Sequence, residues 1–364
     1  MGSKLRAQVN ASKREAAAAG LIDPYSIDRN MTQHQLDIRI EKQRSPIADD
    51  VSALFAIVRP ILLGILNSLN TEVLEKAGGR NKIDLQLLGR LRRQGDGDCG
   101  ICYEYAVHDA VKTGDPKVLE RVADALKQCR VPGDAHESIL FGVEKNGAQQ
   151  IIATAQEILT DDSRLLTGRQ AQPPKLRNYL SRLAGAFRRP TTRTSLPTSI
   201  NGLWKADLFL GCTDSDRWIG TTVKINPRNL EGANGLRVGI VPASEGRSDR
   251  IRKDDSKNLI VCPLPYDGSF MEAFYYSWNI VQQFFAADAR LPREVALPNG
   301  SQRQIARWLE ERRGFPVMDV IGAMKPISQP ELLETDEQEV SLFLKSSEES
   351  KTGSIISPVA TMTE

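Results

Sequence analysis

The chain has 364 residues, of which 40% are hydrophobic and 26% are charged, and its formal net charge at pH 7 is +2. This composition is ordinary for a soluble globular protein, and the length suits one large domain or two smaller ones. The small net charge gives by itself no indication of a nucleic-acid partner. Five cysteines at irregular spacing argue against a disulfide framework and favour a reducing, cytoplasmic location.

The first part of the chain has a polar segment and then a strongly apolar one. Residues 1–45 are predicted to be polar, partly helical and partly mobile, and they lack the apolar core and cleavage site of a signal peptide. The apolar run 51–69 is interrupted by Arg59 and Pro60. A membrane span needs about 20 apolar residues with few charges. We therefore expect a buried, kinked helix or helix pair here, and no contact with a membrane.

The region 46–200 is predicted to be mainly helical. Residues 94–100 break the chain with three glycines, and Asp98 is placed to cap the helix that follows. Apolar residues recur at helical spacing on both sides of this break. The helices expected are 47–77, 81–93, 99–112, 115–129, 134–160 and 174–187. Residues 188–202 are predicted to form a linker, because they contain two prolines and show no periodicity.

The region 201–330 shows a different pattern. Runs rich in β-branched and aromatic residues, bounded by Gly, Pro, Asn and Asp, are typical of strands. They are LWKADLFLG, RWIGTTVKI, GLRVGIVPA and NLIVCPLPY. Helices are expected to follow at 269–289, 301–313 and 316–325. The tail, 331–364, is acidic and Ser/Thr-rich and is predicted to be disordered. The pattern predicts an α+β (mixed α/β) fold, with a helical N-terminal half and a small mixed sheet of about four strands flanked by helices.

Two features of this pattern bear on partners. The stretches 80–93 and 175–193 are basic, and we expect Arg90, Arg92, Arg93, Arg188 and Arg189 to hold backbone phosphates of nucleic acid. The alternative is an ordinary solvated helix face. The helix expected at 269–289 is rich in aromatic residues, which raises base stacking as a function. Most of them form one stripe at helical spacing, which favours core packing, whereas Tyr275 and Tyr276 lie off the stripe.

Two adjacent strands of the predicted sheet carry opposite charges near their middles. Asp207 lies in the run 203–211, and Lys224 lies in the run 217–225. Alternate side chains of a strand share a face, so in-register pairing places Asp207 and Lys224 on the same side. Such a pair is either a cross-strand ion pair, worth less than about 1 kcal/mol, or part of a catalytic site.

Metal-assisted hydrolysis of phosphodiesters needs both kinds of group. A carboxylate fixes Mg²⁺, a hard ion that prefers oxygen ligands, and the bound ion activates water. A nearby lysine orients or deprotonates that water, or stabilises the charge that develops. A further acid usually completes the set of metal ligands.

Along the chain, an acid on a helix is followed by a strand with Asp and then by a return strand with Lys. This order resembles the PD-(D/E)xK nuclease superfamily, which has the restriction-endonuclease-like fold. Glu104, in the helix predicted at 99–112, resembles the helical acid of that family. Asp207 resembles its metal-binding Asp, and Lys224 resembles its lysine. The sequence departs from the pattern at Thr222, where the family usually has an acid, and at Ala206, where it has Pro.

The resemblance implies a divalent cation, Mg²⁺ or Mn²⁺, bound by Glu104 and Asp207, with Lys224 acting on water and on transition-state charge. The missing acid could come from Asp214, Asp216 or Glu231, of which Glu231 is preferred. The implied function is an endonuclease acting on nucleic acid, with DNA favoured over RNA. By analogy with similar nucleases, it would serve bacterial defence against phage or foreign DNA and would work as a homodimer. No nucleotide-triphosphate motif is present, so a protein partner would supply any energy or targeting.

Other readings of the sequence stay open. The fold could be retained without catalysis, as an interaction module that binds a protein or nucleic acid, with Thr222 marking the lost acid. The segment CGICY resembles the surroundings of the papain nucleophile, which would make Cys102 a nucleophile, but no histidine follows at the expected distance. A zinc site would use ligands of suitable type, Cys99, Cys102, Cys129 and His136. A redox dithiol is disfavoured because no strand precedes CGIC, and the cysteines are expected to pack as small apolar residues.

Overall fold

A computed structural model describes residues 32–38, 46–92, 98–141, 157–168, 173–177, 180, 191, 206–232, 235–244, 248–266, 270–290, 297, 299–328 and 340–346. The chain divides into two compact units, one formed by residues 1–43 with 334–364 and the other by residues 44–333. In the first unit, β1 (Thr32–Ile38) pairs with β9 (Val340–Ser346) in an antiparallel ladder. The sequence predicts no strand in either range, and the rest of the N-terminal segment and tail lies outside the described residues.

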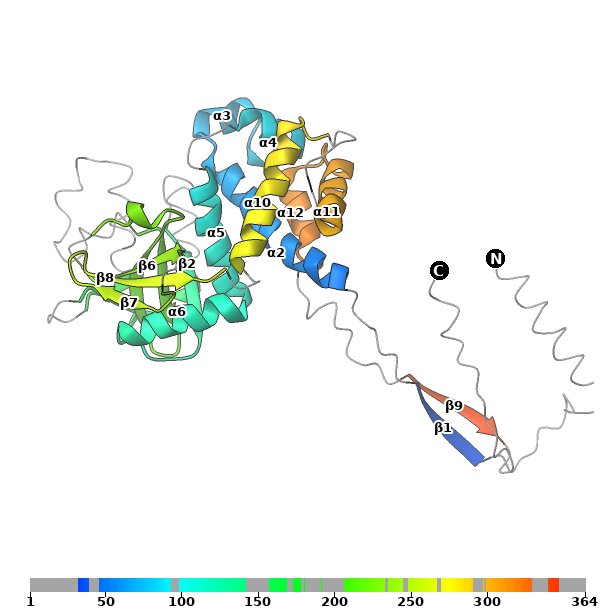
Figure 1. The fold of residues 1–364 in the computed structure, drawn as a ribbon, viewed down its shortest axis with the longest axis horizontal. Helices are drawn as coiled ribbons and strands as arrows, with labels where there is room; N and C mark the ends of the chain where they lie inside the picture. The colour runs from blue at the N-terminus through cyan, green and yellow to red at the C-terminus, as the bar shows by residue number, and fades with distance from the viewer. Residues whose placement is uncertain are drawn as a thin grey trace, which may run out of the picture. The chain divides into compact units, whose positions relative to one another are not determined.

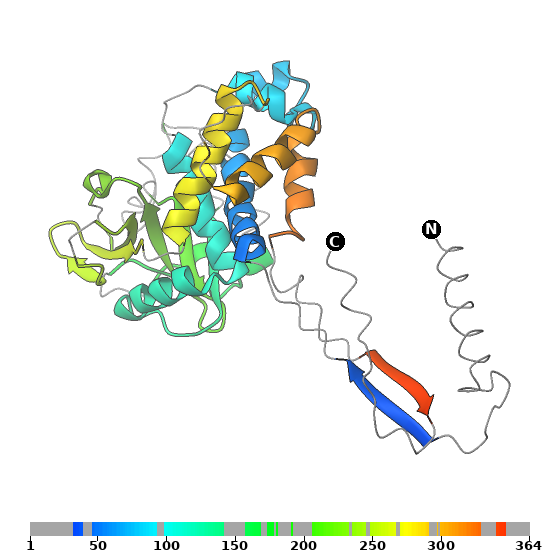
Figure 2. The same cartoon turned by 45° about the vertical axis from the view of Figure 1, so that its right-hand side comes forward.

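The second unit contains a helical bundle built around α2 (Pro46–Ser68). Helices α5 (Asp98–Thr113), α10 (Phe270–Ala286), α11 (Gly300–Glu311) and α12 (Val317–Met324) all pack against α2 (Figures 1 and 2). The shorter elements α3 (Thr71–Lys76), η1 (Arg80–Lys82) and α4 (Leu85–Leu91) connect α2 to α5. Core positions of α2 such as Val58, Ile61 and Leu62 are fully buried, each contributing about 1.5–3 kcal/mol of hydrophobic free energy.

The structure of α2 tests the prediction made for the apolar run 51–69. It is one continuous helix with Pro60 inside, so the helix-pair alternative is wrong. The window Val51–Ser68 is long and apolar enough to cross a membrane by composition, but 72% of it is buried inside the protein. The charge of Arg59 is paired with Asp109 of α5. These features make α2 the central helix of the bundle.

The second unit also contains a seven-stranded mixed sheet. Its strands are β2 (His136–Leu140), β3 (Arg164–Leu166), β4 (Leu208–Cys212), β5 (Arg217–Val223), β6 (Arg237–Pro242), β7 (Arg252–Asp254) and β8 (Leu259–Leu264). The order is β2-β4-β5-β6-β8-β7, and β3 pairs with β5 off this path. Strands β2, β4 and β5 form an antiparallel meander, whereas β5, β6 and β8 run parallel. Parallel strands end at a common edge, so β5, β6 and β8 share a C-terminal edge.

Helices α5 and α6 (Pro116–Gln128) cover one face of this sheet, α5 over β2 and β5 and α6 over β8. Helix α5 also packs on α2, so it lies between the bundle and the sheet (Figure 1). Asp115 caps α6 by accepting hydrogen bonds from the next turn, and Pro116 fits the first helical position because it has no N–H to satisfy there. Apolar side chains of both layers form one core, which includes Val107, Val122 and Ile240.

The sequence predicts the mixed α+β class and most elements of the second unit. The helices expected at 99–112, 115–129, 269–289 and 301–313 are confirmed to within a few residues. The helix expected at 134–160 is wrong at its start, because β2 occupies His136–Leu140 and joins the sheet beside β4, and residues 142–156 lie outside the described residues. Most of the helix expected at 174–187 lies outside the described residues. Strands β2, β3 and β7 enlarge the sheet beyond the four strands that the sequence predicts.

Candidate functional site

Asp207 and Lys224 lie at the open end of the β4–β5 hairpin, one residue outside the strands. The backbone N–H of Asp207 donates to the carbonyl of Thr221 at 2.8 Å, and the carbonyl of Asp207 accepts from Phe141 at 2.8 Å. The N–H of Lys224 donates to the carbonyl of Ile240 on β6 at 2.9 Å. The sheet therefore fixes the backbone under both charged side chains.

Glu104 reaches the same place from α5. Lys224 Nζ donates to Asp207 Oδ2 at 2.9 Å and lies 3.5 Å from Glu104 Oε1. The exposed fractions of the side chains are 7% for Glu104, 18% for Asp207 and 32% for Lys224. The structure thus brings together the three residues that the sequence singles out. Glu104 lies 120 residues before Lys224 in the chain, and Asp207 lies 17 residues before it. The site is partly open, so a ligand from solvent can reach the ammonium.

Asp207 Oδ2 accepts two further hydrogen bonds. The donors are the hydroxyl of Thr222 at 3.0 Å and the backbone N–H of Val223 at 2.9 Å. Thr222 stands where the PD-(D/E)xK pattern usually has an acid; it is 4% exposed, and its hydroxyl donates to the carboxylate of Asp207. Hydrogen bonds that favour the charged form of a carboxylate also fix its orientation. The interactions described at Asp207 leave Oδ1 as the oxygen that can bind another group.

The environment of Lys224 keeps it protonated. Burial acts to lower the pKa of Lys224, but the charges of Asp207 and Glu104 and their hydrogen bonds outweigh burial, so the pKa lies above its ordinary value. A lysine in this state is a cation and hydrogen-bond donor at neutral pH. It is suited to orienting water or stabilising negative charge, and less to removing a proton.

Arg237, which sequence reasoning missed, is the second cation near Asp207. It lies at the start of β6, is 2% exposed, and its Nη1 and Nη2 have no hydrogen-bond partner in the structure described here. Burial lowers the pKa of Arg237 to about 10, although the negative charge of Asp207 acts in the opposite direction. An arginine inside the strand-like run GLRVGIVPA is the signal that could have identified it, because charged residues are almost never fully buried without a partner.

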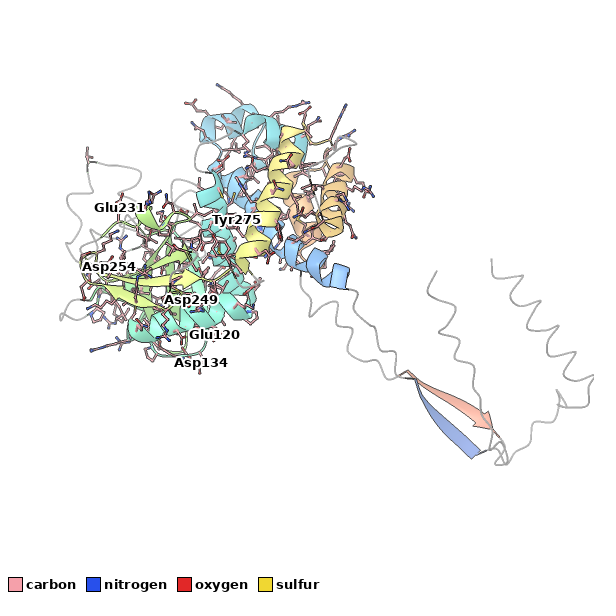
Figure 3. The ribbon with its side chains drawn as sticks, viewed as in Figure 1. Glu120, Asp134, Glu231, Asp249, Asp254 and Tyr275 are labelled. Atoms are coloured by element: carbon pink, nitrogen blue, oxygen red, sulfur yellow. The ribbon has the colours of Figure 1, made fainter. Side chains whose placement is uncertain are left out.

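The other acids considered for the site lie elsewhere. Asp214 and Asp216 lie at the closed end of the hairpin, where Asp214 accepts from the backbone of Asp134 and Asp216 accepts from Ser163. Glu231, labelled in Figure 3, lies on an exposed turn after η4 (Pro227–Asn229). Among the described residues, no group of three or more His, Cys, Asp or Glu side chains is arranged to hold a metal ion.

Two carboxylates nevertheless fit a magnesium ion. Mg²⁺ keeps several water ligands and is usually bound through one or two carboxylates together with substrate phosphates. Glu104 and Asp207 supply hard oxygen ligands, and they already hold a cation, the ammonium of Lys224, between them. The two carboxylates are therefore of a type that would bind Mg²⁺ or Mn²⁺ if water or other oxygens completed the set of ligands.

The arginines expected to contact nucleic acid have different surroundings. Arg90 is exposed and forms two hydrogen bonds of 2.7 Å with Asp288. Arg92 is buried, where it binds Asp98 and Gln282 and lies over the rings of Trp278 and Phe285. The prediction that Arg92 holds a backbone phosphate is wrong, because phosphate cannot reach a buried guanidinium. Arg93, Arg188 and Arg189 lie outside the described residues.

The cysteines form neither a nucleophile site nor a zinc site among the described residues. Cys102 is fully buried, and its thiol donates to the carbonyl of Ile61. His108 is bound to Ser138 through Nδ1 at 2.8 Å. Burial, helped by the charge of Asp98, raises the pKa of Cys99 to about 11, so this thiol is protonated at neutral pH. Cys99, Cys102, Cys129 and His136 do not gather into a metal-binding group.

Comparisons with models of protein families, with curated proteins and with solved structures found no match.

Proposed function

We propose that this chain is a metal-dependent nuclease with a divergent restriction-endonuclease-like core. The observation that supports this proposal most is the convergence of Glu104, Asp207 and Lys224 at the open end of the β4–β5 hairpin. In chain order they come from α5, from the position before β4 and from the position after β5, and the PD-(D/E)xK resemblance implies the same order. The substrate would be nucleic acid, with DNA favoured, and the cofactor Mg²⁺ or Mn²⁺.

Each residue has a distinct part in this proposal. Asp207 offers Oδ1 as a ligand, while Thr222 and Val223 hold its other oxygen in place. Glu104 supplies the second carboxylate from α5. Lys224 is a cation placed beside both, where it can orient the attacking water and stabilise the negative charge of the phosphorane-like transition state. A bound divalent cation would lower the pKa of water and neutralise phosphate charge.

Among the described residues, the site has no third acid of the kind that the PD-(D/E)xK pattern includes, and this favours a second candidate function. Because Thr222 stands where that acid would be and the ammonium of Lys224 is paired with both carboxylates, these three charged groups could serve only to stabilise the sheet. The protein would then be a catalytically inactive module that binds a protein or nucleic acid. Both functions keep these ion pairs in place, so cleavage activity distinguishes the two functions and stability does not.

The experiment is a cleavage assay on supercoiled plasmid, single-stranded DNA and RNA, with Mg²⁺, Mn²⁺ or EDTA. We expect metal-dependent cleavage by the wild type and a loss of about 100-fold or more in Glu104→Gln, Asp207→Asn and Lys224→Met. Asp214→Asn and Arg228→Met change the same kinds of charge at exposed positions that have no role in the proposal, and both variants should keep activity. Cleavage that survives Asp207→Asn would refute the proposal, and no cleavage of any substrate favours the inactive module.

A further inference from the structure

Two tyrosines form an exposed stack at the edge of the sheet where β8 ends. The ring centroids of Tyr266 and Tyr275 are 5.9 Å apart, and their planes differ by 3°. Tyr266 is 46% exposed, whereas large apolar side chains are mostly buried in the described part of the chain. The two hydroxyl groups are 3.3 Å apart and hydrogen-bonded. One aromatic ring is thus held flat on another and faces solvent.

The stack rests on a rigid base. The ring of Phe274 contacts Tyr275 edge-on at 5.6 Å, and Tyr103 of α5 contacts Phe274 at 5.2 Å. Tyr103 and Phe274 are both fully buried. Because the core fixes Tyr275, a ligand that stacks on this surface loses little free energy in ordering it. The stripe of core residues predicted on α10 is confirmed at Phe274, and Tyr275 lies off the stripe as expected.

The stack and the candidate site lie at the same end of the sheet, where the parallel strands finish. Lys224 follows β5 and Tyr266 follows β8, and both strands end at the shared C-terminal edge, two strands apart. The strand spacing and the pairing register place these two residues within about 15 Å of each other. Tyr103 and Glu104 are neighbours on α5, so one helix supports both the stack and the carboxylates. Figure 3 labels Tyr275 where α10 approaches α5.

We propose that Tyr266 and Tyr275 form a subsite for an unpaired nucleobase of the nucleic acid cleaved at Glu104, Asp207 and Lys224. This inference rests on the proposed function and narrows its substrate to single-stranded segments or frayed ends. Stacking of a base on an aromatic side chain contributes about 1–3 kcal/mol and tolerates any sequence, because every base has a π-face. Bases in an intact duplex are stacked on one another and reach such a surface only after unstacking.

The test measures binding without cleavage. Fluorescence anisotropy of labelled oligonucleotides, single-stranded and duplex, is recorded in EDTA at one fixed salt concentration, because salt alone changes the affinity. We expect the wild type to bind the single strand more tightly than the duplex, and Tyr266→Ala to weaken single-strand binding by about tenfold. Tyr266→Phe keeps the ring and should stay within about twofold of the wild type.

A matched control is Tyr276→Ala on the same helix. Tyr276 is also exposed, at 37%, but its hydroxyl bonds to Glu272 and its ring is outside the stack. The stacking subsite is overturned if Tyr266→Ala binds single strands like the wild type, if Tyr276→Ala loses as much, or if the wild type binds no oligonucleotide. Cleavage by the same proteins is measured separately, so metal-dependent cleavage unaffected by Tyr266→Ala leaves the nuclease standing without this subsite.

Discussion

The ammonium of Lys224 would repel the metal ion that we propose for this site. Its ammonium lies between the two carboxylates that would bind the ion, 2.9 Å from Asp207 and 3.5 Å from Glu104. Like charges repel at such distances, by about 4 kcal/mol at an intermediate dielectric constant. A cation that enters must therefore displace the ammonium or share the carboxylates with it. In the proposed mechanism, the residue that acts on water and phosphate charge would also compete with the metal ion for the carboxylates.

Removing this ammonium should raise metal affinity while activity is lost. We expect Lys224→Met to bind Mn²⁺ at least about tenfold more tightly than the wild type, because both carboxylates lose their counter-charge. Isothermal titration calorimetry measures this directly. Arg228→Met removes an exposed positive charge nearby and serves as the control. Equal or weaker Mn²⁺ binding by Lys224→Met would mean that Glu104 and Asp207 do not form the metal site.

Two neighbouring threonines of β5, Thr221 and Thr222, allow the effect of the Thr222 hydrogen bond to be distinguished from the effect of packing. Both are buried, but the hydroxyl of Thr222 donates to Asp207, whereas that of Thr221 has no partner in the structure described here. We expect Thr222→Val to lower the free energy of unfolding by about 1 kcal/mol or more, and Thr221→Val to be neutral or stabilising. Urea denaturation measures both, and equal effects of the two changes would contradict the role assigned to Thr222.

The sequence allowed the convergence of Glu104, Asp207 and Lys224 to be predicted, because strand alternation pairs the last two and the PD-(D/E)xK resemblance adds the first. It did not predict Arg237 near Asp207, because that proximity depends on β6 pairing beside β5. The hydrogen bond from Thr222 to Asp207 could not be predicted either, because the hydroxyl reaches Asp207 only when the hairpin register is set.

Strand β2 shows what element prediction lacked. Its sequence, HESIL, is short and follows a helix-rich region, so periodicity alone favoured another helix. The strand exists because its backbone pairs with β4 and its residues Ser138 and Ile139 are fully buried. Long-range pairing of this kind is decided by tertiary contacts and overrides local propensity.

The contact between α5 and β2 makes stability depend on pH. Burial, together with the positive charges of Lys112 and Arg59, lowers the pKa of His108 to about 3, and its imidazole is bound to Ser138. Since the unfolded chain has the ordinary value near 6.5, it binds a proton that the folded state refuses between about pH 6.5 and 3. The contribution of His108 to stability is therefore complete above about pH 6.5 and falls as the pH is lowered.

Replacing this histidine should remove that part of the pH dependence. Between pH 6.5 and 5, we expect the free energy of unfolding of the wild type to fall by about 2 kcal/mol more than that of His108→Gln. Urea denaturation at several pH values provides the comparison, with other acidic groups common to both proteins. Parallel curves for the two proteins would show that His108 is not buried in its neutral form.

At the scale of the whole molecule, residues 44–333 form one unit with a continuous core. Residues from α2, α5, α6, the sheet and α10 to α12 all belong to one hydrophobic cluster. We expect the fragment 44–333 to unfold cooperatively, with a midpoint within a few degrees of the full chain, because its core lies inside these bounds. Circular dichroism during heating measures it. A broad transition or a much lower midpoint would show that the terminal segments are part of the fold.

We propose above that Glu104, Asp207 and Lys224 form a metal-dependent phosphodiesterase site. The most direct measurement is the rate at which purified protein nicks supercoiled plasmid with Mg²⁺ and with EDTA, for the wild type, Asp207→Asn and Asp214→Asn. We expect nicking that requires Mg²⁺, persists in Asp214→Asn and falls by about 100-fold or more in Asp207→Asn. Nicking that is insensitive to EDTA, or equal in the two variants, would contradict it.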